Sequence, residues 1–332
     1  MIPLRQPAAF PSAGSTGGYG PFAAGATPAY ILLAAMAALI AMLVRLLGCD
    51  IDRHDVPTMI AVQASFVGAA FLLRSRGMRR SAAGIEAAVL ILAATMATAC
   101  LCVLLATTAF PYRDALLDRA DRIIMPLFGW GDMFEALRAH STIVSAMCRI
   151  YQTLLWQPFV LVTALAAIGQ ERRCWQFVHA WFVTLAICVV IFPFVPAAGE
   201  YVYRGLSNAD IPALTVDTAW RQFAVLQQIR SGVALDLTPT HMTGIIAFPS
   251  FHAAGATLLA WGFRRLPVIG VPFMLLDIAM AATAPLVGAH YFVDIIAGIA
   301  VALLAIRIAT YDDRDGRDGR DGGTGGVRFI RP

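Results

Sequence analysis

Long apolar runs, separated by shorter polar segments, dominate the pattern of this chain. A bilayer core is crossed by about 20 consecutive helical residues. Eight runs reach or approach that length, at approximately 28–47, 56–73, 84–109, 152–169, 176–197, 247–263, 268–288 and 290–309. The pattern predicts an all-α, polytopic membrane protein with about eight transmembrane helices.

Composition supports this prediction and excludes several classes of function. The 332 residues are 59% hydrophobic and only 14% charged, outside the range of ordinary soluble domains. All 25 basic residues are arginine, so no mechanism that needs a lysine is available. We expect no nucleic-acid partner, because no basic stripe with interleaved aromatic residues is present. The six cysteines are dispersed without metal-ligand spacing, so we expect neither a metal nor a cofactor.

The composition changes along the chain and divides it into four parts. Residues 1–27 are rich in Pro, Gly, Ser and Ala, and residues 312–332 repeat Arg, Asp and Gly, so both are expected to be disordered tails. Between them, 28–110 is expected to hold the N-terminal transmembrane helices. A second membrane domain, 111–311, carries the candidate chemistry.

Arginines mark one end of every second helix. They follow the second, fourth and sixth runs, at Arg74, Arg76, Arg79, Arg80, Arg172, Arg173, Arg264 and Arg265. Since basic loops stay in the cytoplasm, both termini are predicted to be cytoplasmic. Segments 110–151 and 198–246 and the turn near 285–289 then lie outside. The protein is expected in the plasma membrane, which in a bacterium is the inner membrane.

Two histidines and one carboxylate form the candidate catalytic group. His290 and Asp294 are four residues apart in a segment that reads as helix, so they should share a face. The carboxylate would fix one ring nitrogen and leave the other as a nucleophile or base. His252, in the first turn of the sixth run, would enter the membrane from the same outer side. One histidine that attacks and another that donates a proton suffice for displacement at phosphorus without a metal.

Three further residues are candidates for binding phosphate. Ser250 follows Pro249 at a predicted helix start, where exposed N–H groups can bind an anion, although a serine there is also an ordinary helix cap. Segment 218–230 has the pattern of a helix on the membrane surface. Arg230, in that segment, and Arg204 are the candidate phosphate-binding arginines. Arginines beside a membrane are also common interface anchors.

Some polar residues in the apolar runs have no evident role. These are Glu86, Gln152, His179 and Asp277. A path for ions or protons through His290, Asp294 and Asp277 is a remote alternative to catalysis. Such a path requires polar residues that continue across the membrane to the cytoplasmic side. The eighth run has none between Asp294 and Arg307.

Two short motifs resemble a known family. Pro249-Ser250-Phe251-His252 and His290-Tyr291-Phe292-Val293-Asp294 resemble the second and third signature motifs of the type 2 phosphatidic acid phosphatase (PAP2) superfamily. The resemblance covers roughly 244–309 and implies a PAP2-like catalytic helix bundle. It also implies that His290 forms a phosphohistidine, that Asp294 orients His290, and that His252 protonates the leaving group.

The motifs depart from the usual pattern at several positions. Phe251 stands where the family usually has Gly, and Thr283 and Ala284 stand where it has Ser-Arg. The first motif needs a lysine, which this chain lacks. These features resemble the branch of the fungal inositol phosphorylceramide synthases, which are phosphotransferases. The implied function is hydrolysis of a membrane lipid phosphate. The alternative is transfer of a phosphate headgroup to a second, acceptor lipid.

Overall fold

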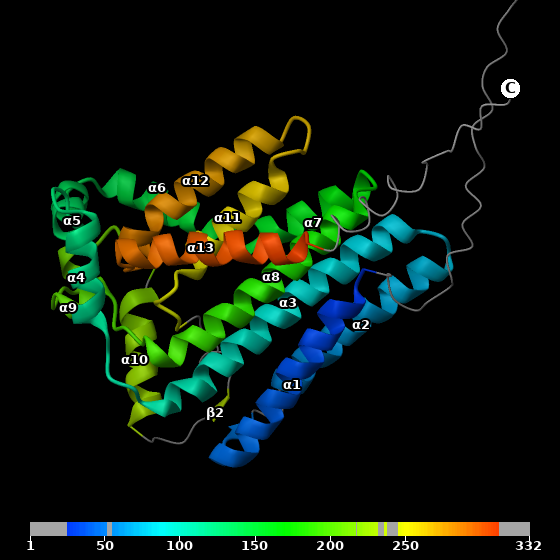
Figure 1. Ribbon diagram of the computed structural model, residues 1–332, viewed down its shortest axis with the longest axis horizontal. Helices are drawn as coiled ribbons and strands as arrows, with labels where there is room; N and C mark the ends of the chain where they lie inside the picture. Colours follow the sequence, from blue (N-terminus) through cyan, green and yellow to red (C-terminus); the bar gives the residue numbers. More distant parts are fainter. Residues whose placement is uncertain (1–24, 52–54, 217, 232–235, 238–244, 312–332) are drawn as a thin grey trace, which may run out of the picture.

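The computed structural model describes residues 25–51, 55–216, 218–231, 236–237 and 245–311, which are mostly helical (Figure 1). In chain order the α-helices are α1 Thr27–Leu47, α2 Asp55–Ser75, α3 Arg79–Leu105, α4 Asp114–Ile124, α5 Trp130–Arg138, α6 Ser141–Tyr151, α7 Gln157–Ala167, α8 Glu171–Ile191, α9 Glu200–Tyr203, α10 Thr218–Arg230, α11 Phe251–Phe263, α12 Gly270–Val287 and α13 Phe292–Ala309. The 3-10 turns are η1 Ala106–Thr108, η2 Gln152–Leu155, η3 Phe192–Phe194 and η4 Asn208–Asp210. Strand β1 Asp50–Ile51 pairs in parallel with β2 Asp236–Leu237. The predicted tails, 1–27 and 312–332, lie outside the described residues except for 25–27.

Six helices of the described part are long and apolar enough to cross a membrane: α1, α2, α3 with η1, α8 with η3, α12 and α13. A seventh candidate span is the pair formed by α6 with η2 and α7, which meet at a bend of 49°. The prediction of a polytopic helical membrane protein is confirmed, but with six or seven candidate spans rather than about eight. The main difference is the predicted run 247–263. Its helix, α11, begins only at Phe251 and has 13 residues, fewer than the roughly 20 that span a bilayer.

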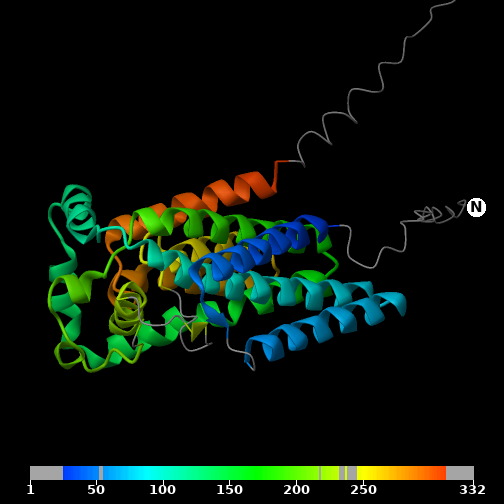
Figure 2. The same ribbon diagram turned by 90° about the horizontal axis from the view of Figure 1, so that it is seen from below.

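Helices α1 and α2 lie at the edge of the bundle and pack on α3 (Figure 1, Figure 2). Their apolar side chains are mostly exposed, among them Ile31, Leu46 and Ile60. Exposed apolar surface of this extent is expected where a helix faces lipid. Helices α1 and α2 therefore contribute little of the buried core.

The core lies among α3, α7, α8, α11, α12 and α13. Small residues bring these helices close together, as is usual inside membranes. At Gly298 of α13, an added Cβ would lie 2.3 Å from the Ser250 carbonyl oxygen. The backbone just before α11 therefore touches α13 directly. This close approach brings the two candidate motifs together.

Three of the polar residues that the sequence left unexplained have defined surroundings. The buried Glu86 carboxylate forms an ion pair with Arg74 and accepts a hydrogen bond from the Tyr30 hydroxyl. The His179 ring bonds to the Gly25 carbonyl oxygen at 2.8 Å. Asp277 lies beside Gln157, but neither of its carboxyl oxygens makes a well-formed hydrogen bond to any residue that the structure describes.

The two ends of the bundle differ in character. Helices α4, α5, α9 and α10 gather at the end where α13 begins (Figure 1). At the opposite end, Arg80 donates a hydrogen bond to the Ala167 carbonyl oxygen, and Arg173 and Arg264 line one small pocket with Thr310, which follows α13. The basic turns are thus collected at the end away from the two histidine motifs.

Candidate active site

His290 and Asp294 contact each other through the turn that begins α13. The Oδ2 atom of Asp294 lies 3.2 Å from Nδ1 of His290 and accepts a hydrogen bond of 3.0 Å from the Tyr291 backbone N–H. His290 is 4% exposed and Asp294 is fully buried. The predicted shared helical face is wrong, because His290 precedes α13, which begins at Phe292. With a proton on Nδ1, His290 has a free lone pair on Nε2.

The start of α11 is tied to the same turn. The Ser250 backbone N–H donates to the Asp294 carbonyl oxygen at 3.0 Å. The Ser250 hydroxyl oxygen accepts from the Ala253 N–H at 3.3 Å, so Ser250 acts as the helix cap. His252 follows in the first turn. The structure therefore brings Ser250, His252, His290 and Asp294 together, although about 40 residues separate the two motifs.

Tyr151 and Gly288 lie between the two histidines. The His252 ring stacks on the Tyr151 ring, with centroids 3.7 Å apart. An added Cβ at Gly288 would lie 2.5 Å from the Tyr151 hydroxyl oxygen and 2.6 Å from Cδ2 of His290. Both imidazoles therefore border the same small region.

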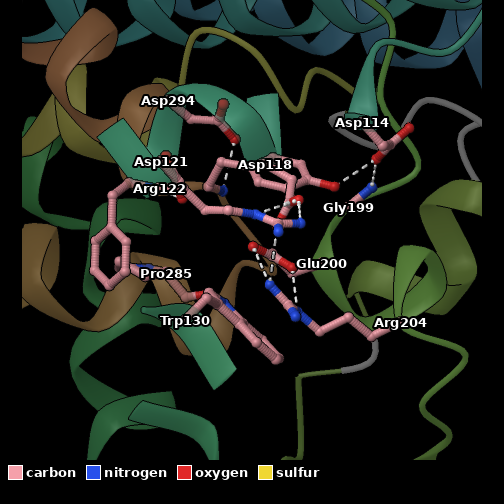
Figure 3. A network of polar contacts seen from close by, with 12 residues as sticks. Asp114, Asp118, Asp121, Arg122, Trp130, Gly199, Glu200, Arg204, Pro285 and Asp294 are labelled. Atoms are coloured by element: carbon pink, nitrogen blue, oxygen red, sulfur yellow. Dashed lines mark hydrogen bonds and ion pairs between the residues drawn. The ribbon is translucent and has the colours of Figure 1, made fainter. Parts of the chain in front are cut away.

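Helix α4 holds the His290 segment in place through two aspartates that the sequence analysis missed. Asp114 accepts hydrogen bonds from the Ala198 and Gly199 N–H groups, each at 3.0 Å, and from the Tyr291 hydroxyl at 2.9 Å (Figure 3). Asp121 accepts from the N–H groups of Phe292 and Val293, at 2.7 and 2.8 Å. A carboxylate at this position satisfies the free N–H groups of α13 and complements its dipole. The helical spacing of Asp114, Asp118 and Asp121 was the available sequence signal.

A pocket of about 500 Å³ lies beside α4. Its lining includes Asp118, Asp121, Trp130, Glu200 and Arg204. The Arg204 guanidinium pairs with Glu200 at 2.6 Å and with Asp118 at 3.3 Å, and it lies over the Trp130 ring. The positive charge of this candidate phosphate-binding arginine is therefore already balanced by two carboxylates.

Arg230 occupies a different place. Its guanidinium lies over the Tyr112 ring, 4.2 Å from the centroid, and α10 packs beside η1. In the described part of the chain, no hydrogen bond or ion pair joins Arg230 or Arg204 to His252, His290 or Asp294. The structure thus brings both histidines and Asp294 together but gives neither arginine a contact with them.

Burial of Glu200 leads to a prediction about pH. Burial raises the pKa of this carboxyl group from 4.5 to about 7, more than its ion pair with Arg204 lowers it. Between these pH values the folded protein holds a proton that the unfolded chain has lost, so the free energy of unfolding should fall as pH rises from 4.5 to 7. Glu200→Gln should flatten this dependence in thermal unfolding of the detergent-solubilised protein. Glu135→Gln, at an exposed carboxylate of the same pocket, should leave the pH dependence of unfolding unchanged. The prediction would be contradicted if stability changed with pH as steeply in the Glu200 variant as in the wild type.

The comparisons with known proteins agree with the motif resemblance. The family model described as PAP2 superfamily matches residues 115–308, more than half of the chain. No curated protein and no solved structure gave a significant match. The match includes α4, which carries Asp118 and Asp121, and both histidine motifs. This chain is a member of the PAP2 superfamily.

Proposed function

We propose that this protein is an integral-membrane phosphatase that cleaves the phosphate ester of a membrane lipid through a phosphohistidine intermediate. Membership of the PAP2 superfamily implies phosphatase-type activity. The observation that carries the finer proposal is the joint position of the two histidines: His290 bonded to Asp294, and His252 stacked on Tyr151 beside it. This arrangement supplies a nucleophile, an orienting carboxylate and a proton donor at one place.

In the first step Nε2 of His290 attacks phosphorus. A nitrogen–phosphorus bond forms as the phosphorus–oxygen bond to the lipid breaks, and His252 gives its proton to the departing oxygen. Asp294 accepts a hydrogen bond from the Nδ1–H group and stabilises the positive charge that develops on the ring. In the second step His252 takes a proton from water, the water oxygen attacks phosphorus, and His290 is released.

The proposed location of the reaction is the extracytoplasmic membrane surface. The basic turns gather at the end of the bundle opposite the histidines, and basic turns are normally cytoplasmic. A lipid headgroup in the outer leaflet could then reach His290 from the side. The two reactants in this proposal are a lipid phosphate and water.

Headgroup transfer of the inositol phosphorylceramide synthase type uses the same residues, so the assay must separate the two reactions. Purified protein would be offered phosphatidic acid or an isoprenyl phosphate, in chelator, with and without ceramide or diacylglycerol. We expect release of inorganic phosphate without an acceptor. A phosphorylated product that forms only with an acceptor would instead show a transferase. Activity that is lost in chelator and restored by a divalent ion would indicate a metal phosphatase.

A further inference from the structure

Tyr151 reaches the candidate site from a helix that carries neither motif. It is the last residue of α6, it is 3% exposed, and it packs beside α12. Its ring lies nearly parallel to the His252 imidazole, at an angle of 13° and a centroid distance of 3.7 Å. A flat contact of this kind restricts rotation of the imidazole about its χ2 angle. The ring of Tyr151 is therefore in a position to fix the direction in which His252 presents its proton.

The hydroxyl of Tyr151 lies close to Gly288, two residues before the other histidine. It lies 2.5 Å from the place where a Cβ of residue 288 would be, and Cδ2 of His290 lies 2.6 Å from the same place. Glycine at this position is what allows the two groups to come so close. One side chain thus contacts His252 with its ring and borders His290 with its hydroxyl.

This hydroxyl has no hydrogen-bond partner among the described residues. Most polar atoms with little exposure find a partner in the protein or in water, so such a group near a reactive histidine is available to a ligand. A phosphoryl group bound between His290 and His252 would lie beside it. A phenol can donate a hydrogen bond to a non-bridging phosphoryl oxygen and keep its own proton throughout.

The arrangement of charges makes such a neutral donor useful. The chain has no lysine, Arg204 is balanced by Glu200 and Asp118, and Arg230 lies over Tyr112. Negative charge that develops on the phosphoryl oxygens must be stabilised by fixed donors in the site. The Tyr151 hydroxyl is suitably placed to be one of them.

We propose that Tyr151 is a fourth functional side chain of this site: its hydroxyl donates a hydrogen bond to a phosphoryl oxygen of the substrate, and its ring positions His252 as the proton donor. This inference rests on the proposed function. It assigns no new bond-breaking step, because the phosphoryl group still passes to His290 and the proton still comes from His252.

Two substitutions separate the two roles. Tyr151→Phe keeps the stacked ring and removes only the hydroxyl, so kcat should fall on the order of 10²-fold, with KM changed little. Tyr151→Leu also removes the stack, so proton donation should fail as well. The loss in Tyr151→Leu should then be larger for a lipid phosphate, whose alkoxide leaves poorly, than for an alkyl-substituted nitrophenyl phosphate, whose phenolate leaves without a proton. In Tyr151→Phe the loss should be similar for both substrates.

Tyr201→Phe is the matched control. The Tyr201 hydroxyl is buried, has no hydrogen-bond partner in the part of the chain that the structure describes, and belongs to the same apolar cluster, but its ring contacts Trp130 rather than a histidine. Tyr201→Phe should keep wild-type turnover.

Turnover of Tyr151→Phe equal to that of wild type would overturn the role of the hydroxyl, and equal losses on both substrates in Tyr151→Leu would overturn the role of the ring. The proposed function fails separately, if wild-type protein neither turns over a lipid phosphate nor forms a phosphoenzyme.

Discussion

Replacing His290 with glutamine is expected to abolish turnover, with a loss of roughly 10⁴-fold or more. Glutamine has a similar size and can still bond to Asp294, but it has no ring nitrogen that can attack phosphorus. The protein should therefore fold and bind lipid while forming no covalent intermediate. The measurement is rapid-quench labelling with a substrate that carries radioactive phosphate. Wild-type protein should retain label that is lost in acid and stable in base, and the variant should retain none.

His179→Gln is the matched control for this experiment. His179 is a half-buried histidine of α8, and its ring bonds to the Gly25 carbonyl oxygen at the opposite end of the bundle. Its replacement should leave labelling and turnover unchanged. Label that persists in the His290 variant would show that another residue is the nucleophile, and the mechanism proposed for this site would be wrong.

Replacing Asp294 with asparagine should lower kcat by roughly 10³- to 10⁴-fold while KM changes little, by analogy with the orienting aspartate of hydrolase triads. The amide nearly matches the carboxyl group in shape, so the capping turn of α13 should persist. The amide oxygen can take the place of Oδ2, which bonds both the Tyr291 N–H and Nδ1 of His290, but the neutral amide cannot stabilise the positive charge that develops on the ring. Single-turnover kinetics should show slow formation of the phosphoenzyme rather than slow breakdown.

A suitable control is Asp210→Asn. Asp210 also caps a turn, by accepting hydrogen bonds from the N–H and hydroxyl of Ser207, but it lies at an exposed site in the loop that follows α9. Its replacement should not alter kcat. If kcat of the Asp294 variant stays within tenfold of the wild-type value, the carboxylate only stabilises the turn and does not orient His290.

The sequence was sufficient for the class of fold because lipid imposes simple rules. Runs of about 20 apolar residues read as spanning helices, and six of the eight predicted runs contain helices that meet this criterion on their own. The sixth run, 247–263, was wrongly predicted to span the membrane, because apolarity does not reveal where a helix begins. The short helix α11 is buried by its neighbours α8, α12 and α13. A buried helix is as apolar in sequence as a helix that faces lipid, so the two could not be told apart.

Spacing along the chain was a weaker guide to the site. It paired His290 with Asp294 correctly, but as neighbours on a helix rather than across a capping turn, because the exact start of a helix depends on backbone hydrogen bonds. Arg204 was selected as a charge that could meet phosphate. Its pairing with Glu200 and Asp118 depends on α4 and α9 packing together, which no local pattern predicts.

By itself, the sequence determined that this chain is a helical membrane protein and which two histidines and which aspartate were candidates for chemistry. Those properties follow from composition and from contacts between residues close in the chain. Only the tertiary structure placed Tyr151 between the histidines and brought Asp114 and Asp121 to the start of α13. These contacts join residues more than 90 positions apart, so no pattern of neighbouring residues predicts them. Gly298 lets the backbone before α11 approach α13 closely, and Gly288 leaves room for the Tyr151 hydroxyl.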